Sequence, residues 1–434
     1  IMKITFLNHA SFIIQEKYFK LCCDPYLFGS AFNNGFNLLK EEDHEEQLKN
    51  LTHIFFSHEH PDHFSPPTLK KIDHNYRKNI VILYQKTIDQ KIKNYCKNLG
   101  FKKFIELRSN HFYKIDDKLI INCTQYTYGD SYILFKTPDL KILNINDCVF
   151  DTIEKVRILE NQFGKIDILF TQFGYANKIG RRNEPQKRLK ESEEKLNRIK
   201  LQYEYLRPDY IIPFASFIYF CHQENYYMND GMNKINTVHE FIQTNLQSKP
   251  IIMYPNDVWE IGCEFNSINS INKYEVDYLK IEKKKLIQSK KVGLQTLFIN
   301  SKLFVNRLWK KNPQYRMISR LKNASIFLID YGESFILNGY NGLSRKTIEY
   351  SNCDIALSSE ALNFVFLFEW GAETLNVNAR FEIPMNGNYY NFQFLGNLSA
   401  LNNRGDRWYL SMGNAYNYIK SGIIQDIKIF VDFL

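Results

Sequence analysis

The sequence contains little that would cross-link or anchor the chain. Eight cysteines are scattered among 434 residues with no paired spacing, which predicts reduced thiols rather than a disulfide framework. No stretch approaches the roughly 18–20 consecutive apolar residues of a membrane helix. No secretory signal opens the chain. These absences argue against a disulfide-rich secreted scaffold and a membrane protein, and they favour a cytoplasmic location.

The length predicts two domains, each large enough to bury its own core. The composition changes after Glu264, where a polar, lysine-rich connection begins. We therefore expect the domain boundary between residues 1–262 and 263–434. Within the second part, apolar positions from Leu357 to Phe368 have helical spacing, and "TLNVNARFE" alternates like a strand. We expect a smaller α+β domain with a packing, dimerisation or substrate-groove role, which leaves a homodimer open.

The first 262 residues alternate β-rich runs with helical patterns, which is typical of an α/β protein with mixed sheets. A hairpin is expected to turn at Pro138-Asp139, between "YILFK" and "KILNIND". A long charged helix is expected from about Asn183 to Leu206. Its basic and acidic residues interleave, which favours a solvated helix over a nucleic-acid arm. The formal net charge of +9 is therefore not taken as evidence for a nucleic-acid partner.

The most informative stretch is "FFSHEHPDHFSPPTL", Phe55 to Leu69. It follows an apolar strand and places His58, His60, Asp62 and His63 within six residues. A strand end delivers alternate residues to one side, and the following turn brings the next ones round. We therefore expect His58 and His60 to bind one metal and Asp62 and His63 a second, with the two ions sharing a bridging group.

The pattern His-x-His-x-Asp-His after an apolar strand resembles the signature of the metallo-β-lactamase superfamily. The resemblance implies an αββα sandwich, two β-sheets flanked by helices, with the metals at one edge. "DPYLF" resembles the segment whose aspartate, here Asp24, braces the loop that carries the histidine cluster (residues 57–63, the metal loop). "LNINDC" resembles the strand end that supplies the bridging carboxylate, here Asp147.

The chain departs from the hydrolytic members of that superfamily at two ligands. They generally carry another histidine before the bridging aspartate. Here the best-placed polar residue is Asp130, which is either a metal ligand or an ordinary turn residue. They commonly present a last histidine soon after a strand of the "YIIPF" kind. Here the first histidine after that strand is His222, a ligand or a core residue, followed by Glu224 as a ligand or acid–base candidate.

Several longer stretches resemble the CMP-N-acetylneuraminate hydroxylase-like branch of the superfamily, including "FLNHASFII", "DPYLFGSAFNNGFNLL" and "IPFASFIYFCH". That branch implies O2-dependent hydroxylation. The sequence lacks the Cys-x-His and Cys-x-x-His pairs of a Rieske centre, so a reductase or ferredoxin is expected to supply electrons. Di-iron oxygenases of the same fold, which also replace a histidine ligand with a carboxylate, give a second resemblance. In this reading His9 faces the substrate, supports a ligand or packs in the core.

Two functions therefore remain open. The first is a dinuclear non-haem iron oxygenase that hydroxylates or N-oxygenates a small molecule, because carboxylate ligands suit iron that changes oxidation state. The second is a di-zinc or di-manganese hydrolase of a phosphodiester, lactone or amide. Asp62, Asp147 and Glu224 are the expected catalytic carboxylates. A binding protein with a degenerate site is disfavoured by the intact histidine cluster.

Overall fold

The computed structural model describes residues 2–17, 19–311 and 320–403. The chain divides into two compact units. The first is Ile1–Gln288 together with Leu375–Glu382, and the second is Ser289–Thr374 together with Ile383–Leu434. Among the described residues, no helix combines the length and apolar character needed to cross a bilayer.

One seven-stranded sheet of the first unit carries the N-terminal strands. Its order is β17 (Val258–Glu260), β1 (Lys3–Asn8), β2 (Ser11–Glu16), β3 (Phe19–Cys23), β6 (His53–Phe56), β7 (Val81–Gln85) and β8 (Lys103–Leu107). Strand β2 is antiparallel to both β1 and β3, and β3, β6, β7 and β8 are parallel. Strands β1, β3 and β6 therefore end at the same edge of the sheet.

The second sheet also has seven strands. Its order is β16 (Lys249–Pro250), β14 (Tyr210–Phe214), β13 (Ile168–Gln172), β12 (Lys141–Asn144), β11 (Ser131–Lys136), β10 (Ile120–Gln125) and β9 (His111–Lys114). Strands β11 and β12 form an antiparallel hairpin, which confirms the turn predicted at Pro138-Asp139. Strands β12, β13 and β14 are parallel. The start of β11 and the end of β12 consequently lie at one edge.

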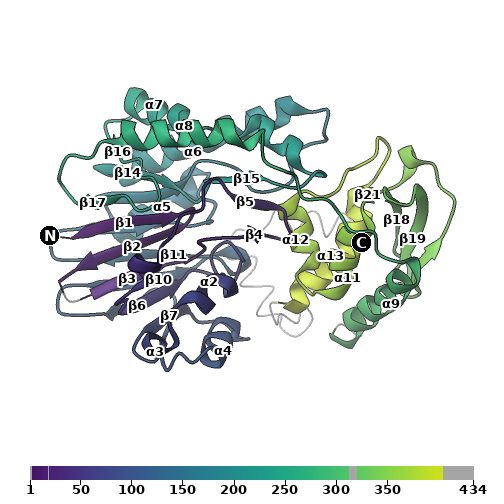
Figure 1. The fold of residues 1–434 in the computed structure, drawn as a ribbon, viewed down its shortest axis with the longest axis horizontal. Coiled ribbons are helices and arrows are strands. Elements are labelled where there is room, and N and C mark those ends of the chain that lie inside the picture. The colour runs from purple at the N-terminus through teal and green to yellow at the C-terminus, as the bar shows by residue number, and fades with distance from the viewer. Residues whose placement is uncertain (1, 18, 312–319, 404–434) are drawn as a thin grey trace. The chain divides into compact units, whose positions relative to one another are not determined.

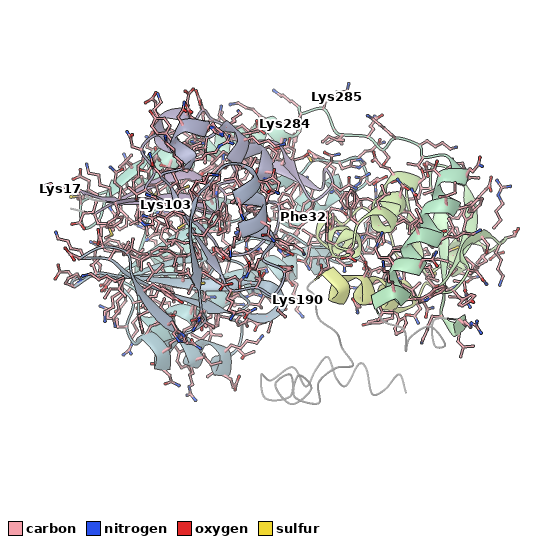
Figure 2. The ribbon with its side chains drawn as sticks, turned by 90° about the horizontal axis from the view of Figure 1, so that it is seen from below. Lys17, Phe32, Lys103, Lys190, Lys284 and Lys285 are labelled. Atoms are coloured by element: carbon pink, nitrogen blue, oxygen red, sulfur yellow. The ribbon has the colours of Figure 1, made fainter. Side chains whose placement is uncertain are left out.

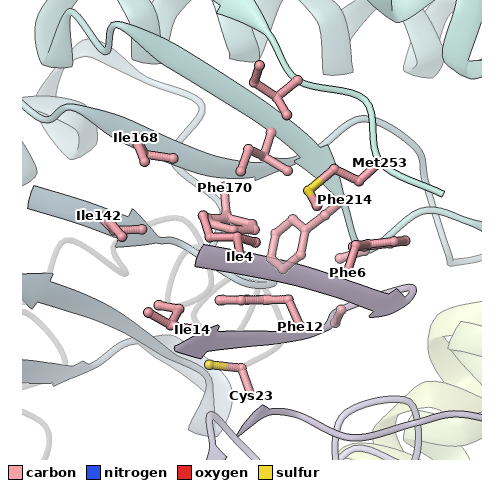
Figure 3. Close-up of a cluster of buried hydrophobic side chains, with 14 of the residues drawn as sticks. Ile4, Phe6, Phe12, Ile14, Cys23, Ile142, Ile168, Phe170, Phe214 and Met253 are labelled. Carbon is pink, nitrogen blue, oxygen red and sulfur yellow. The ribbon is translucent and has the colours of Figure 1, made fainter. Parts of the chain in front are cut away.

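The two sheets pack face to face over an apolar core (Figure 3). Phe12 of the first sheet stacks on Phe170 of the second with ring centroids 4.2 Å apart, and Phe214 meets Phe170 edge-on at 5.3 Å. Alternate residues of each strand point into this layer, as a pleated strand requires. The core joins the sheets firmly, so their strand ends are held in fixed positions.

Helices cover the outer faces of both sheets (Figure 1). They are α2 (Pro66–Lys71), α3 (His74–Arg77) and α4 (Lys91–Asn98) on one side, and α5 (Ile153–Phe163), α6 (Pro185–Leu206), α7 (Ile235–Asn245) and α8 (Ser267–Ile281) on the other. A short helix, α1 (Glu45–Leu48), precedes β6. The expected αββα sandwich is confirmed, and α6 is the predicted long charged helix. Figure 2 shows the side chains of this unit, in which the labelled Lys17, Lys103 and Lys190 appear at separate places.

The first unit extends beyond the residue 262 expected from the sequence. Helix α8 contributes Ile271 and Tyr274 to the hydrophobic core of this unit, and Tyr274 stacks on Phe217 at 4.3 Å. The polar residues of this helix face outward, which explains why the segment resembles a linker in the sequence. A small sheet of β15 (Ile218–Phe220), β5 (Phe36–Leu38) and β4 (Ser30–Ala31) completes the unit.

The second unit is α+β in character. Its sheet has the order β20 (Gly342–Arg345), β19 (Glu333–Asn338), β18 (Asn323–Leu328), β21 (Ile355–Leu357), and its helices include α9 (Leu294–Lys311), α11 (Ser359–Leu367) and α13 (Tyr389–Asn403). The strand predicted for "TLNVNARFE" is wrong, because Gly371–Asn378 forms helix α12. Burial at Ala372, Leu375 and Asn378 follows a helical period. Residues 312–319 and 404–434 of the expected second domain lie outside the described residues.

Candidate metal centre

Polar side chains collect where strands of the two sheets end. His9 follows β1, Asp24 follows β3 and His58 follows β6, and these three strands run in the same direction. Asp130 precedes β11 and Asp147 lies three residues after β12. Strand direction alone therefore gathers residues that are far apart in the sequence.

A first group of ligand-type residues consists of His58, His60 and Asp130. Nε2 of His58 lies 2.9 Å from Nδ1 of His60 and 3.7 Å from Oδ1 of Asp130. The structure thus brings the two histidines of the predicted first metal position together with the carboxylate expected in place of an imidazole. Asp130 stays a predicted ligand, but the geometry argues against an ordinary turn residue.

A second group consists of His9, Asp62 and His63. Nε2 of His9 lies 3.3 Å from Oδ2 of Asp62, and Nε2 of His63 lies 3.9 Å from the same oxygen. His9 was not among the ligands predicted from the sequence. Its position directly after β1, which ends at the same edge as β6, was the signal that could have identified it.

Asp147 lies between the two groups. Its Oδ1 is 3.2 Å from Nε2 of His63, and its Oδ2 is 3.7 Å from Nε2 of His58. Gln172, the last residue of β13, donates a hydrogen bond from Nε2 to Oδ1 of Asp147 at 2.5 Å. One carboxylate oxygen toward each group is the arrangement that a bridging ligand requires.

The donor atoms fit a pair of metal ions. Two atoms bound to one ion at about 2.0–2.2 Å must themselves lie within a few ångströms of each other, and the members of each group lie within 4.8 Å. Nδ1 of His9 and Oδ1 of Asp62 are buried without a hydrogen-bond partner. Buried polar atoms are normally paired, so these two point to a missing ligand. Two divalent cations would also offset the carboxylate charges of Asp62, Asp130 and Asp147.

Asp24 braces the metal loop rather than contributing to either group. It is fully buried, and its carboxylate accepts hydrogen bonds at 2.7 Å from both the backbone N–H and the hydroxyl of Ser57. Its Oδ2 lies 2.9 Å from Nδ1 of His63. This contact fixes the His63 ring and leaves its Nε2 directed at Asp147. Burial raises the pKa of Asp24, against the opposing effect of His63.

The loop between β10 and β11 (residues 126–130, the Asp130 loop) is held against the metal loop by a second set of hydrogen bonds. Gln85, at the end of β7, donates from its amide nitrogen to the carbonyls of Ser57 and Gly129. The hydroxyl of Ser131 donates to the same Ser57 carbonyl at 2.7 Å. The backbone carbonyl of Ser57 therefore ties together the segments that carry His58 and Asp130.

The ionisation of the group follows from these contacts. Burial, together with the neighbouring His63 and His60, holds the pKa of His58 well below its usual range, which keeps it a neutral donor. Burial disfavours the charged form of Asp147, but His63 and His58 outweigh it and lower its pKa. A neutral imidazole and an ionised carboxylate are the forms that bind metals.

His222 and Glu224 lie in the loop after β15 and belong to neither group. The backbone N–H of His222 donates to Oδ1 of Asn225 at 3.0 Å, and the backbone N–H of Glu224 donates to Nδ1 of His222 at 3.1 Å. Glu224 accepts a 2.7 Å bond from Nε of the fully buried Arg380. Among the described residues, His222 is in neither ligand group, whereas His9 is in the second. His222 stays a predicted ligand.

Comparison with known proteins agrees with this architecture. Residues 3–174 match the family described as the beta-lactamase superfamily domain. This part of the chain is a metallo-β-lactamase-fold domain, and the superfamily is one of enzymes.

Three similar proteins illustrate the range of relatives. The cytidine monophosphate-N-acetylneuraminic acid hydroxylase of Xenopus laevis is 31% identical over 154 residues, which cover 34% of this chain and 26% of that protein. The structure of CmlA, a diiron beta-hydroxylase from Streptomyces venezuelae, is 12% identical and covers 60% of this chain and 54% of its own, with a TM-score of 0.42. An isothiocyanate hydrolase from Delia radicum gut bacteria is 16% identical and covers 60% of this chain and 99% of its own, with a TM-score of 0.44. The matched part of the chain spans 35% of the length of one curated relative and 26% of another.

Proposed function

We propose that this protein is an O2-dependent oxygenase with a dinuclear iron centre, which hydroxylates a small molecule at carbon or oxygenates it at nitrogen. The observation that carries the proposal is the composition of the two ligand groups. Each offers two imidazoles and one carboxylate, His58, His60 and Asp130 in one and His9, His63 and Asp62 in the other. Asp147 adds a shared carboxylate to both.

This donor set suits iron better than zinc. Carboxylate oxygens stabilise the ferric state, and sets of two histidines and a carboxylate with open positions are typical of non-haem iron that activates O2. When bound, the iron pair supplies electrons to O2. One oxygen atom goes to the substrate and the other to water, so the reaction also consumes two electrons from an external donor, a reductase or ferredoxin, and two protons from solvent.

The residues of the chain hold and orient this chemistry. Asp24 fixes the His63 ring, and Gln85 and Ser131 fix the Asp130 loop. The His58 and His63 side chains are buried, whereas the Asp147 side chain is 24% exposed. A substrate would therefore approach from the Asp147 side, where Gln172 holds the bridging carboxylate in place.

The second candidate is a di-zinc or di-manganese hydrolase. It is favoured by the complete set of His58, His60, Asp62 and His63, which can equally hold ions that activate water. Asp62, whose Oδ1 lacks a hydrogen-bond partner, would accept the proton of the attacking water.

A measurement of oxygen uptake distinguishes the two functions. The protein is loaded anaerobically with Fe(II), its metal content is determined, and O2 consumption is followed with an added reductant. We expect uptake proportional to bound iron and accompanied by a new visible absorption band. Asp117→Asn, at an exposed carboxylate, is the control that should leave uptake unchanged. Iron that stays inert to O2, while the zinc or manganese form cleaves phosphodiesters or lactones, would favour the hydrolase instead.

A further inference from the structure

The hairpin formed by β4 and β5 covers the metal centre with aromatic side chains. The ring of Phe32 meets the ring of His60 edge-on, with centroids 5.6 Å apart. The ring of Phe36 lies 6.3 Å from that of His9 and 5.2 Å from that of Phe32. One phenylalanine of the same hairpin thus lies beside each ligand group.

The hairpin reaches this position through a costly backbone conformation. Phe32, Asn33 and Asn34 are consecutive residues with φ of 51°, 53° and 60°. The left-handed region is tolerated by asparagine but unfavourable for a bulky residue such as phenylalanine. Such a conformation persists only where the surrounding structure imposes it, and it is found preferentially at functional sites.

Buried polar residues from distant segments impose it here. Nη1 of Arg380 donates to the carbonyl of Asn33 at 2.7 Å, and Nδ2 of Asn378 donates to the carbonyl of Phe32 at 3.1 Å. Nδ2 of Asn225 donates to the carbonyls of Gly35 and Asn378, at 2.7 and 2.6 Å. All of these residues belong to the first unit.

The residues that hold the hairpin, Arg380, Asn378 and Asn225, include a buried charge and are closely packed. Arg380 is fully buried, and its Nε donates to Glu224 at 2.7 Å, so the guanidinium joins the loop after β15 to the tip of the hairpin. Gly35 has no room for a side chain, because a Cβ there would come within 2.3 Å of Cβ of Asn378. A buried charge is expensive unless it is paired. Its use to hold one hairpin indicates that the position of the hairpin matters.

We propose that Phe32 is a specificity-determining residue that limits the size of the ligand admitted beside His60. Arg380 and Asn378 are positioning residues, because they act through the backbone of the hairpin. Phe32, labelled in Figure 2, is 6% exposed, and its ring lies against that of His60, which is only half-buried. A smaller side chain would open that space. The proposal rests on the proposed metal centre but not on the oxygen chemistry.

The test uses the full chain loaded with cobalt(II), whose visible spectrum reports ligand binding without any turnover. Azide and the larger ligand imidazole are titrated into the wild type, Phe32→Ala, Phe32→Leu and Arg380→Met. In Phe32→Ala we expect imidazole to bind about tenfold tighter while azide changes little, because a steric wall discriminates by size. Phe32→Leu should give an intermediate ratio, and Arg380→Met should shift the ratio in the same direction as Phe32→Ala.

Phe112→Ala, at a 58% exposed phenylalanine, is the matched control and should keep the wild-type ratio. An unchanged ratio of imidazole to azide affinity in Phe32→Ala or Phe32→Leu, with cobalt still bound, would overturn the proposal and leave the metal centre standing. A wild type that binds no cobalt would instead contradict the metal centre itself. Because Phe32→Leu keeps an apolar side chain, it remains informative if Arg380→Met fails to fold.

Discussion

Nε2 of His9 lies 3.3 Å from Oδ2 of Asp62, although 53 positions separate the two residues in the sequence. The contact follows from the sheet, because β1 and β6 run in the same direction and end at one edge. His9 itself has a φ of 42°, which turns the chain sharply after β1 and directs the side chain inward. The second ligand group depends on this contact.

Removal of the His9 imidazole should therefore cost one of two metal ions. In His9→Ala, we expect iron content to fall toward half of the wild-type value, or affinity for the second ion to drop by about 10- to 100-fold. Metal analysis after dialysis measures this directly. His111→Ala, at an exposed histidine, is the control. His222→Ala should retain both ions, and the opposite outcome for the His9 and His222 variants would restore His222 as the ligand.

The brace formed by Asp24 should control metal affinity without contacting metal. Asp24→Asn keeps the size of the side chain but removes the charge that orients His63 and accepts from Ser57. We expect iron affinity to fall by about 10-fold or more, since partners of metal ligands contribute at this level. Titration with Fe(II) in the presence of a competing chelator measures the change. Full affinity in a folded Asp24→Asn protein would show that the brace is dispensable.

The carboxylate at position 130 should select the metal. In Asp130→His the first group would contain three imidazoles, which suits zinc better than iron that changes oxidation state. We expect O2 uptake of the iron form to fall by at least about tenfold, while zinc content after growth in mixed metals rises. Asp130→Glu should retain more of the uptake than Asp130→His. Equal uptake in all three proteins would mean that Asp130 is a turn residue.

Because of Lys178, the free energy of unfolding should depend on pH in the alkaline range. Burial lowers its pKa to about 8, although Glu382 opposes the shift. The unfolded chain therefore binds more protons than the folded protein between about pH 8 and the ordinary value of 10.5. The buried charge of Lys178 destabilises the folded protein fully below about pH 8, and this cost disappears as pH rises through the window.

We expect the free energy of unfolding to increase by roughly 1–3 kcal/mol across that window through this residue. Urea denaturation at pH 7.5 and pH 10 measures it. Lys178→Met should show a smaller increase than the wild type, whereas Lys190→Met, at a lysine 76% exposed, should match the wild type. An equal rise in Lys178→Met would assign the effect to other groups.

The local part of the site could be predicted from the sequence. His58, His60, Asp62 and His63 lie within one short loop, so their proximity needs only a strand end and a turn. Asp130 and Asp147 could be placed because a single hairpin joins them. These predictions depend on short-range geometry that the chain itself determines.

The parts that depend on the arrangement of several strands could not be predicted in the same way. His9 requires the order of β1, β2, β3 and β6 to be known before its position becomes significant. His222 was predicted from its place after a strand, and the structure shows its backbone bonded to Asn225 and its neighbour Glu224 bonded to Arg380. The "TLNVNARFE" segment alternates like a strand, yet tertiary packing makes it a helix.

We propose that two irons lie at the edge where strands of the two sheets end, each bound by two histidines and a carboxylate and joined by Asp147. The most direct test is a crystal structure of the iron-loaded protein with anomalous diffraction data collected at the iron edge. We predict two peaks about 3.5–4 Å apart, one among His58, His60 and Asp130 and the other among His9, Asp62 and His63. A single peak, or a second peak bound by His222 instead of His9, would contradict the account.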